Sequence, residues 1–265
     1  MLQPIPTSDR LLAARLEAAE AALGMSMAQT AAAALPEADF EPFAGGVALF
    51  AGVGSPMSHA LGIGMRGAVP EDELERLEQF YRERDSACVI DLSTLADASV
   101  IAFIQSRPYR VLEFNNVMVR RISPEDRFET AAGLHVIAAG ELGTWARVVS
   151  EGFAENMPVH DEMVSLLAST CAGGMCWLAG GSEAAGGAAM SAQQGIAVLF
   201  GDAVRLPARR QGWQGQLIRA RLDAAQKLGC EFAMASVLPG SISHRNYERA
   251  GFQLLYTRVN VTREF

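Results

Sequence analysis

The segment Leu206–Gly215 brings together residue types that can hold an anion. It reads Leu-Pro-Ala-Arg-Arg-Gln-Gly-Trp-Gln-Gly, with two adjacent arginines and two glycines. The apolar run Ile196–Val204 before it is typical of a strand, and Trp213–Leu228 after it has the spacing of a helix. The first N–H groups of a helix have no partner inside the helix, so a glycine-containing turn can direct several of them at one phosphate. We therefore expect a pyrophosphate-binding loop.

The composition of the chain narrows the class of protein that this loop could serve. The 265 residues carry a formal net charge of -8 and a pI near 5.1. This balance argues against a protein whose main task is binding nucleic acid or an anionic membrane, whereas a local basic loop suits a small anionic cofactor. No apolar run has membrane-spanning length, and Met1–Arg10 lacks the features of a signal peptide, so we expect a cytoplasmic protein.

The cysteines and histidines are scattered along the chain and show no metal-ligand spacing. We expect the cysteines to be reduced, buried thiols, and we expect no metal site. The residues concerned are Cys88, Cys171, Cys176, Cys230, His59, His135, His160 and His244.

Apolar periodicity and turn-forming residues predict alternating helices and strands on both sides of a polar segment, Ser123–Asp126, where we place the boundary between domains 1–126 and 127–265. The elements expected in the first half are a helix from Ser8 or Asp9 to Gly24, a helical continuation to Ala34, strands at Val47–Ala51 and Ala60–Met65, a helix that begins at Pro70, a strand at Ala87–Leu92, a helix at Ala96–Gln105 and a strand at Val111–Arg120.

The second half is expected to contain a similar succession of elements. These are a strand at Leu134–Ala138, helices at Glu141–Phe153 and Asp161–Cys171, strands at Cys176–Ala179 and Ala188–Ser191 joined by the turn Gly180–Gly187, the strand Ile196–Val204, the helix Trp213–Leu228, a strand at Phe232–Val237, a helix at Ser241–Ala250 and a strand at Phe252–Thr262. Ile218, Leu222, Ala225 and Leu228 form the expected buried stripe of the long helix.

The two halves end in the same order of elements at the same spacing. From the start of the long helix to the start of the last strand there are 38 residues between Glu71 and Tyr109, and 39 between Trp213 and Phe252. This agreement predicts a duplicated domain.

Two motifs of the second half carry a family resemblance. Arg209–Gly212 reads Arg-x-x-Gly at the strand-to-helix turn, and Tyr247–Phe252 reads Tyr-x-x-x-Gly-Phe. With the order β-α-α-β-β-β-α-β-α-β from Leu134 onward, these features resemble the GNAT superfamily of acyl-CoA-dependent N-acyltransferases. The sequence departs from the family at Gln214, where Gly or Ala is usual, and at Pro207, which is one residue nearer Arg209 than usual.

The resemblance implies an α/β (α+β) fold with two GNAT-like domains, each a mixed, mostly antiparallel central sheet flanked by helices. It implies acetyl-CoA as co-substrate. The strand Asp202–Leu206 would splay from Ala233–Val237, and an N–H near Val204 or Leu206 would polarise the thioester carbonyl. The pyrophosphate of acetyl-CoA would bind to the arginines and N–H groups of the loop, which are Arg209, Arg210, Gln211, Gly212, Trp213, Gln214 and Gly215.

The resemblance also nominates residues for proton transfer. It implies that Tyr247 is the acid for the leaving thiolate. Asp202 lies two residues before Val204, on the same face of the strand, and is the first candidate for the base, with His244 next. Each has a plainer interpretation: Tyr247 as a core aromatic, Asp202 as an ordinary edge carboxylate and His244 as a surface or capping residue.

A second glycine motif lies in the first half. Gly62–Gly67 satisfies Gly-x-Gly-x-x-Gly, the pattern of nicotinamide-dinucleotide loops, but its glycines fall inside an apolar run and Val69-Pro70 intervenes before the helix. Under the duplication it is the first copy's counterpart of the cofactor loop, without the Arg-x-x-Gly signature. Dinucleotide binding therefore ranks third among the possible functions.

The sequence thus predicts an N-acetyltransferase that transfers acetyl from acetyl-CoA to a primary amine. The alternative is a non-catalytic acyl-CoA-binding or scaffold protein, favoured by the imperfect loop and the absence of an obvious base. The expected partner is a small-molecule or peptide amine, with no nucleic acid or membrane partner. A homodimer is left open.

Overall fold

The computed structural model describes residue 5 and residues 8–33, 35–129, 133–136, 141–155, 157–171, 174–181 and 183–265. These residues form two compact units. The N-terminal unit comprises the described residues from Ile5 to Val117 with residues 237–239 and 254–265, and the C-terminal unit comprises the described residues of 118–236 and 240–253. Each unit is therefore built from segments that lie far apart in the sequence. The sequence prediction placed a single boundary at Ser123–Asp126, because pairing between strands distant in sequence leaves no local signal.

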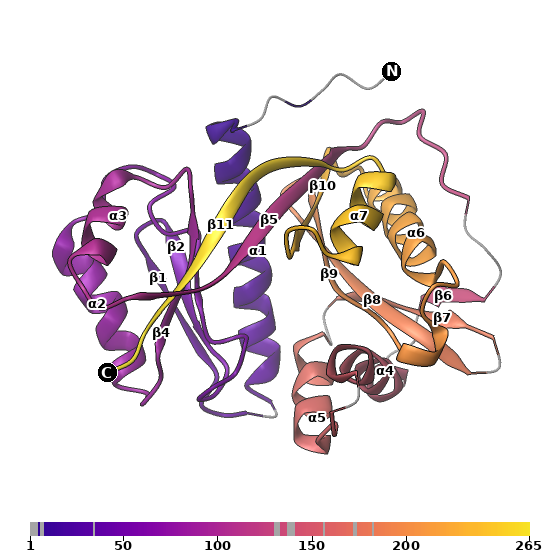
Figure 1. The fold of residues 1–265 in the computed structure, drawn as a ribbon, viewed down its shortest axis with the longest axis horizontal. Helices are drawn as coiled ribbons and strands as arrows, with labels where there is room; N and C mark the ends of the chain where they lie inside the picture. The colour runs from indigo at the N-terminus through magenta and orange to yellow at the C-terminus, as the bar shows by residue number, and fades with distance from the viewer. Residues whose placement is uncertain are drawn as a thin grey trace. The chain divides into compact units, whose positions relative to one another are not determined.

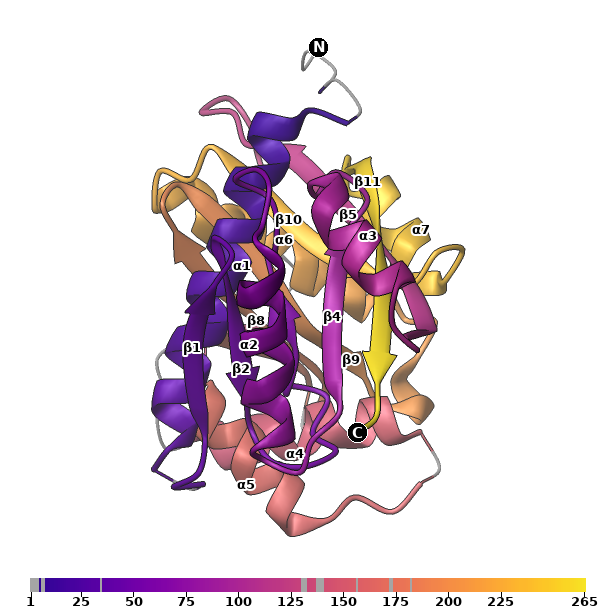
Figure 2. The ribbon, with the colours of Figure 1, turned by 90° about the vertical axis from the view of Figure 1, so that its left-hand side faces the viewer.

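The N-terminal unit contains a mixed sheet between helices (Figures 1 and 2). Helix α1 covers one face of this sheet, and α2 and α3 cover the other. The strands lie in the order β1-β2-β3-β4-β11-β5, with β3 and β4 parallel. The elements are α1 (Arg10–Ala31), β1 (Asp39–Phe43), β2 (Gly46–Phe50), β3 (Ala60–Leu61), α2 (Glu71–Arg82), β4 (Cys88–Ser93), α3 (Ala98–Gln105), the first part of β5 (Arg110–Arg121) and β11 (Gln253–Arg263).

Helix α1 is continuous, whereas the sequence predicted a stop at Gly24 and a second helical segment. Asp9 caps the helix by accepting from the N–H groups of Leu11 and Leu12, each at 3.0 Å. A Cβ added to Gly24 would lie 2.4 Å from Cδ1 of Leu49, so this glycine allows close packing of α1 on β2 and does not end the helix. The predicted end of the continuation, Ala34, lies outside the described residues.

Two strands of the N-terminal unit also differ from prediction. Strand β1 was not predicted, because Pro42 argues against a strand; it is tolerated here because β1 is an edge strand. Strand β3 ends at Leu61 and does not continue to Met65, because Gly62 and Gly64 adopt positive φ angles of 71° and 74°.

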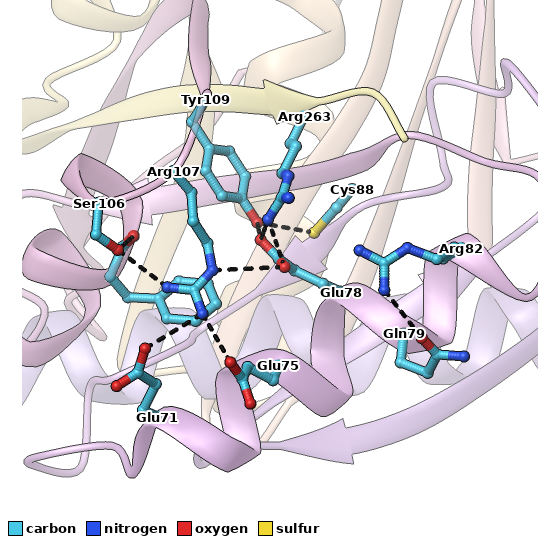
Figure 3. A network of polar contacts seen from close by, with 11 residues as sticks. Glu71, Glu75, Glu78, Gln79, Arg82, Cys88, Ser106, Arg107, Tyr109 and Arg263 are labelled. Atoms are coloured by element: carbon cyan, nitrogen blue, oxygen red, sulfur yellow. Dashed lines mark hydrogen bonds and ion pairs between the residues drawn. The ribbon is translucent and has the colours of Figure 1, made fainter.

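A polar network holds the end of the chain in the N-terminal unit (Figure 3). Glu78 on α2 is buried and accepts from Arg263 Nη1 at 2.6 Å and from Tyr109 Oη at 3.0 Å. Arg107 reaches Glu71 at the start of the same helix, at 3.2 Å, and lies 3.6 Å from Glu78. The network therefore ties both the end of β11 and the turn before β5 to α2.

The C-terminal unit repeats the architecture (Figure 1). Its strands lie in the order β5-β10-β9-β8-β7-β6; β6 to β9 are antiparallel, and β9 and β10 are parallel. Helices α4 and α6 both pack against β7, β8 and β9. The elements are the end of β5, β6 (Leu134–Val136), α4 (Leu142–Ala154), α5 (Asp161–Thr170), β7 (Met175–Gly180), β8 (Ala184–Gln193), β9 (Ile196–Val204), α6 (Trp213–Lys227), β10 (Phe232–Val237) and α7 (Ile242–Arg249).

Two details of the C-terminal unit correct the sequence prediction. Strand β8 begins at Ala184, so Gly187 lies in a strand and not in a turn; a Cβ there would lie 3.0 Å from Trp145, which occupies the space above it. On α6, Leu228 is 55% exposed, and the buried face includes the charged residue Arg221 instead. Positions 137 and 138 of the predicted strand Leu134–Ala138 lie outside the described residues.

The four cysteines are buried and unpaired in disulfides, as predicted. In the described part of the chain, none of the helices combines the length and the apolar character needed to cross a bilayer. The same residues contain no group of three or more His, Cys, Asp or Glu side chains that could hold a metal ion.

Candidate active site

The predicted loop joins β9 to α6 through a short 3-10 helix, Leu206–Ala208. Arg210 and Gly212 have positive φ angles of 64° and 83°, and Gly212 is the N-cap of α6. The first backbone bond of the helix runs from the N–H of Gln216 to the carbonyl of Gly212 at 3.2 Å, so the preceding N–H groups of Trp213 to Gly215 belong to the helix end that has no intrahelical acceptor. No acidic residue stands in the first turn.

Strands β9 and β10 separate toward this loop. Their parallel pairing covers Ile196–Val198 and Phe232–Met234 only, although β9 continues to Val204. The predicted splay is thus present, and it begins within β9 several residues before the loop.

Arg209 does not point to the open end of the helix. Its guanidinium donates to Glu155 Oε1 at 2.7 Å, to the carbonyl of Gly152 at 2.9 Å and to the carbonyl of Val204 at 3.2 Å. Arg209 thus fastens the loop to the end of α4. Arg210, by contrast, is exposed.

A second arginine beside the helix end was not found from the sequence. The guanidinium of Arg219 lies 3.7 Å from the position that a Cβ on Gly215 would take, at the first turn of α6. Helical side chains lean toward the N-terminus of the helix, which brings a residue four positions later back over the first turn. This geometric rule is the signal that could have identified Arg219.

Gln214, the departure from the family pattern, connects α6 to α7. Its Nε2 donates to Ser243 Oγ at 2.9 Å, and its Oε1 accepts from Asn246 Nδ2 at 2.7 Å. The side chain is therefore directed at α7, and the backbone N–H of Gln214 stays in the first turn of α6.

The two predicted proton-transfer residues lie in direct contact. Tyr247 Oη donates to Asp202 Oδ2 at 2.5 Å, and the Tyr247 ring packs edge-on against Phe252 with centroids 4.9 Å apart. Arg221 completes the group: it forms an ion pair with Asp202 and donates to Tyr247 Oη at 3.5 Å. Tyr247 is 2% exposed and Arg221 is fully buried. We call Asp202, Arg221 and Tyr247 the buried triad.

Burial and charge set the protonation states of the triad. Burial raises the pKa of Tyr247 well above its usual value; Arg221 opposes this and Asp202 adds to it. Burial by itself would lower the pKa of Arg221, but Asp202 and Tyr247 raise it above its usual value. The hydroxyl is therefore neutral and the guanidinium charged at ordinary pH.

His244, the second candidate for the base, has its partners near the surface. His244 Nδ1 accepts from the N–H of Gly240 at 3.0 Å, and its Nε2 lies 3.7 Å from Glu248. This is the geometry of a helix-end residue.

The counterpart loop of the N-terminal unit has different chemistry. Helix α2 begins only at Glu71, four residues after Gly67, so the last glycine does not open the helix. Three carboxylates, Glu71, Asp72 and Glu73, occupy its first turn and oppose an anion there. In the same unit, His59 Nδ1 and Asp91 Oδ2 are 3.0 Å apart.

Solved structures share the fold of this chain, which is that of the GCN5-related N-acetyltransferases. A GCN5-related N-acetyltransferase from Kribbella flavida matches with a TM-score of 0.67 at 18% identity, over 95% of this chain and 95% of its own. An acetyltransferase of the same description from Sphaerobacter thermophilus matches with a TM-score of 0.56 at 16% identity, over 78% and 71% of the two chains.

The duplication is also found in a solved structure. A tandem GNAT protein from the clavulanic acid biosynthesis pathway matches with a TM-score of 0.59 at 13% identity, over 98% of this chain and 97% of its own. No protein-family model matches this sequence, and no curated sequence matches it. The fold predicted from the resemblance, two GNAT-like domains in tandem, is therefore confirmed.

Proposed function

We propose that this protein is an acyl-CoA-dependent N-acyltransferase that transfers acetyl from acetyl-CoA to a primary amine. The observation that carries the proposal is the start of α6, a glycine-capped helix end without acidic residues at the mouth of a splayed parallel strand pair. Such a helix end suits a pyrophosphate, and the gap between separated strands suits an extended pantetheine arm.

The residues at this helix end fit the cofactor. The N–H groups of Gln211, Gly212, Trp213, Gln214 and Gly215 are the backbone donors for the pyrophosphate. Arg210 and Arg219 supply positive charge, while Arg209, held by Glu155, supports the loop from behind. Acetyl-CoA supplies the acetyl thioester when it is bound.

The cofactor is proposed for the C-terminal unit alone. Helix ends attract anions through their unpaired N–H groups, and carboxylates in the first turn cancel that attraction. Helix α2 of the N-terminal unit carries three such carboxylates and α6 carries none. The N-terminal unit is accordingly proposed as a copy without a cofactor.

The chemistry proposed for the chain is direct transfer. A backbone N–H near Val204 or Leu206 polarises the thioester carbonyl while the neutral amine attacks its carbon. The C–N bond forms, the C–S bond breaks, and Tyr247 gives its hydroxyl proton to the leaving sulfur. The phenolate formed lies beside Arg221. The amine nitrogen loses its extra proton to solvent, and solvent returns one proton to the phenolate, which restores the Tyr247 hydroxyl. The carboxylate of Asp202 is engaged by Tyr247 and Arg221. In this mechanism it orients the Tyr247 hydroxyl and does not take the proton of the amine.

One observation favours the second candidate, a non-catalytic acyl-CoA-binding protein. Tyr247 is almost fully buried and its hydroxyl is directed at Asp202. Under this reading the triad only supports the fold of the C-terminal unit, and a bound acyl-CoA is retained without transfer.

Two experiments separate these functions. A thermal melt with acetyl-CoA should show stabilisation, about 2.7 kcal/mol when the ligand is at about one hundred times its Kd. Thiol release should then be measured with acetyl-CoA and a panel of small polyamines, amino acids and peptides. Release that depends on an amine supports the transferase, stabilisation without release by any amine supports the binding protein, and the absence of stabilisation removes both.

A matched variant assigns the proton donor. Tyr247→Phe keeps the ring contact with Phe252 and removes only the hydroxyl. We expect unchanged acetyl-CoA affinity and thiol release slower by about a hundredfold, the usual scale for a lost general acid. Release at the wild-type rate would remove Tyr247 from the mechanism.

A further inference from the structure

Arg221 is a charged residue with no access to solvent, and its donors reach four elements of the C-terminal unit. Nε donates to the carbonyl of Leu217 on α6 at 3.1 Å. Nη1 donates to the carbonyls of Ala189 on β8 at 3.2 Å and Phe200 on β9 at 3.4 Å. The remaining contacts are those with Asp202 and with Tyr247 on α7. Burying an arginine is costly unless its donors and its charge are satisfied. The contacts of Arg221 satisfy both, so they offset the cost of burying this residue.

The carbonyls that Arg221 meets flank an irregularity in the sheet. Gly187 pairs with Ala203, whereas Ala189 pairs with Phe200, so two steps along β8 oppose three along β9. This register shift is a β-bulge, and Gly201 within it has a positive φ of 64°. A bulge interrupts the backbone ladder, and Nη1 of Arg221 donates to a carbonyl on each strand at that point.

The bulge also decides where the end of β9 points. An extra residue changes which face of the sheet every later side chain occupies. The bulge directs Asp202 toward α6 and α7, where Arg221 and Tyr247 contact its carboxylate. The bulge also sets the orientation of Val204, at the point where β9 has separated from β10. The guanidinium therefore contacts both the proposed proton donor and the bulge that precedes the end of β9.

We infer that Arg221 is a positioning residue of the transferase, which closes the bulge of β9 and holds Asp202 and Tyr247 in the geometry for proton transfer. This inference rests on the proposed function. Arg221 acts through its neighbours: its own contacts are with the protein, and the loop of α6 that would hold the pyrophosphate begins in a different turn of the helix.

Arg221→Lys tests the inference, because it keeps the positive charge and removes the planar set of donors. We expect a fall in kcat for thiol release of about tenfold or more, the scale of a misplaced catalytic group. The Kd for acetyl-CoA should stay within about twofold of wild type, since the pyrophosphate loop is untouched. The ring carbon signal of Tyr247 in tyrosine-labelled protein, assigned with Tyr247→Phe, should also shift. Arg249→Lys is the matched control, an exposed arginine of α7 that contacts Asn246.

The outcomes separate the inference from the function on which it rests. Wild-type kcat in Arg221→Lys, with release by the wild-type protein intact, would overturn the inference alone. An equal loss of acetyl-CoA affinity and kcat would also overturn it, because that pattern indicates general distortion. No release by wild type with any amine would remove the proposed function and the inference together.

A second variant covers the case in which Arg221→Lys does not fold. Asp202→Asn leaves the carbonyl contacts of Arg221 in place and weakens both its ion pair with residue 202 and the hydrogen bond from Tyr247 to that residue. The inference predicts the same fall in kcat with the acetyl-CoA Kd preserved, and unchanged kcat would overturn it.

Discussion

Placing a negative charge at residue 214 should weaken cofactor binding and leave the fold intact. In Gln214→Glu the new side chain has the same length, and both of its oxygens can accept from Ser243 and Asn246, the present partners of Gln214. An acidic residue in the first turn stabilises a helix by about 0.3–1 kcal/mol. The melting temperature without ligand should therefore stay the same or rise.

The expected loss of affinity follows from Coulomb's law. A phosphate oxygen bound by first-turn N–H groups lies about 3 Å from the nitrogens, and we take a separation of about 6 Å, twice that distance, between it and the carboxylate of residue 214. At that distance two unit charges repel by about 0.7 kcal/mol in water and about 3 kcal/mol near a protein surface. We expect a net cost of about 2 kcal/mol for the pyrophosphate, or a rise in Kd of about thirtyfold.

Calorimetric titration with acetyl-CoA measures this change. Gln105→Glu, an exposed position on α3 in the N-terminal unit, adds the same charge and should leave Kd unchanged. The effect of Gln214→Glu should shrink in high salt, where charges at the surface are screened. Equal Kd values for Gln214→Glu and wild type at low salt would refute the assignment of the pyrophosphate to this helix end.

Two further predictions concern the N-terminal unit. Glu78→Gln removes the buried carboxylate of the network in Figure 3 and should lower the free energy of unfolding by about 3 kcal/mol, whereas Glu71→Gln, whose side chain is 72% exposed, should cost less than about 1 kcal/mol. Equal urea midpoints for the two variants would contradict this. Burial by itself would lower the pKa of His59, but Asp91 raises it above 6.5, so the protonated ring stabilises the fold fully below pH 6.5 and loses this effect as the pH rises through the folded-state pKa. The stability difference between wild type and His59→Gln should therefore be larger at pH 6 than at pH 9, and a difference that grows with pH would be inconsistent with the ion pair.

Much of the fold could be predicted because local signals and tertiary packing agree along most of the chain. Strand Ile196–Val204 was predicted with its observed bounds, and α2 begins directly after Pro70, whose missing N–H is harmless at a helix start. The strand-helix order and the spacing of the two halves also predicted the duplication. The loop at Arg209–Gly212 lies at the predicted turn.

The remaining features depend on contacts that the sequence does not display. Gly24 has the local character of a helix stop, and only the position of Leu49 explains why the helix continues. Arg221 has the character of a solvated helix residue until β8, β9 and α7 surround it. Arg209 was predicted to meet phosphate, and its contact with Glu155 joins residues 54 positions apart. Site residues whose partners come from distant segments were therefore the ones that sequence patterns could not assign.

The stoichiometry of acetyl-CoA binding distinguishes one cofactor site from two. We place the cofactor at the start of α6 and not at the acidic start of α2. Isothermal titration of the full chain should therefore show one acetyl-CoA bound per chain, and Gln214→Glu should weaken that single site. Two equivalents per chain, or no binding at all, would contradict a single cofactor site at the start of α6.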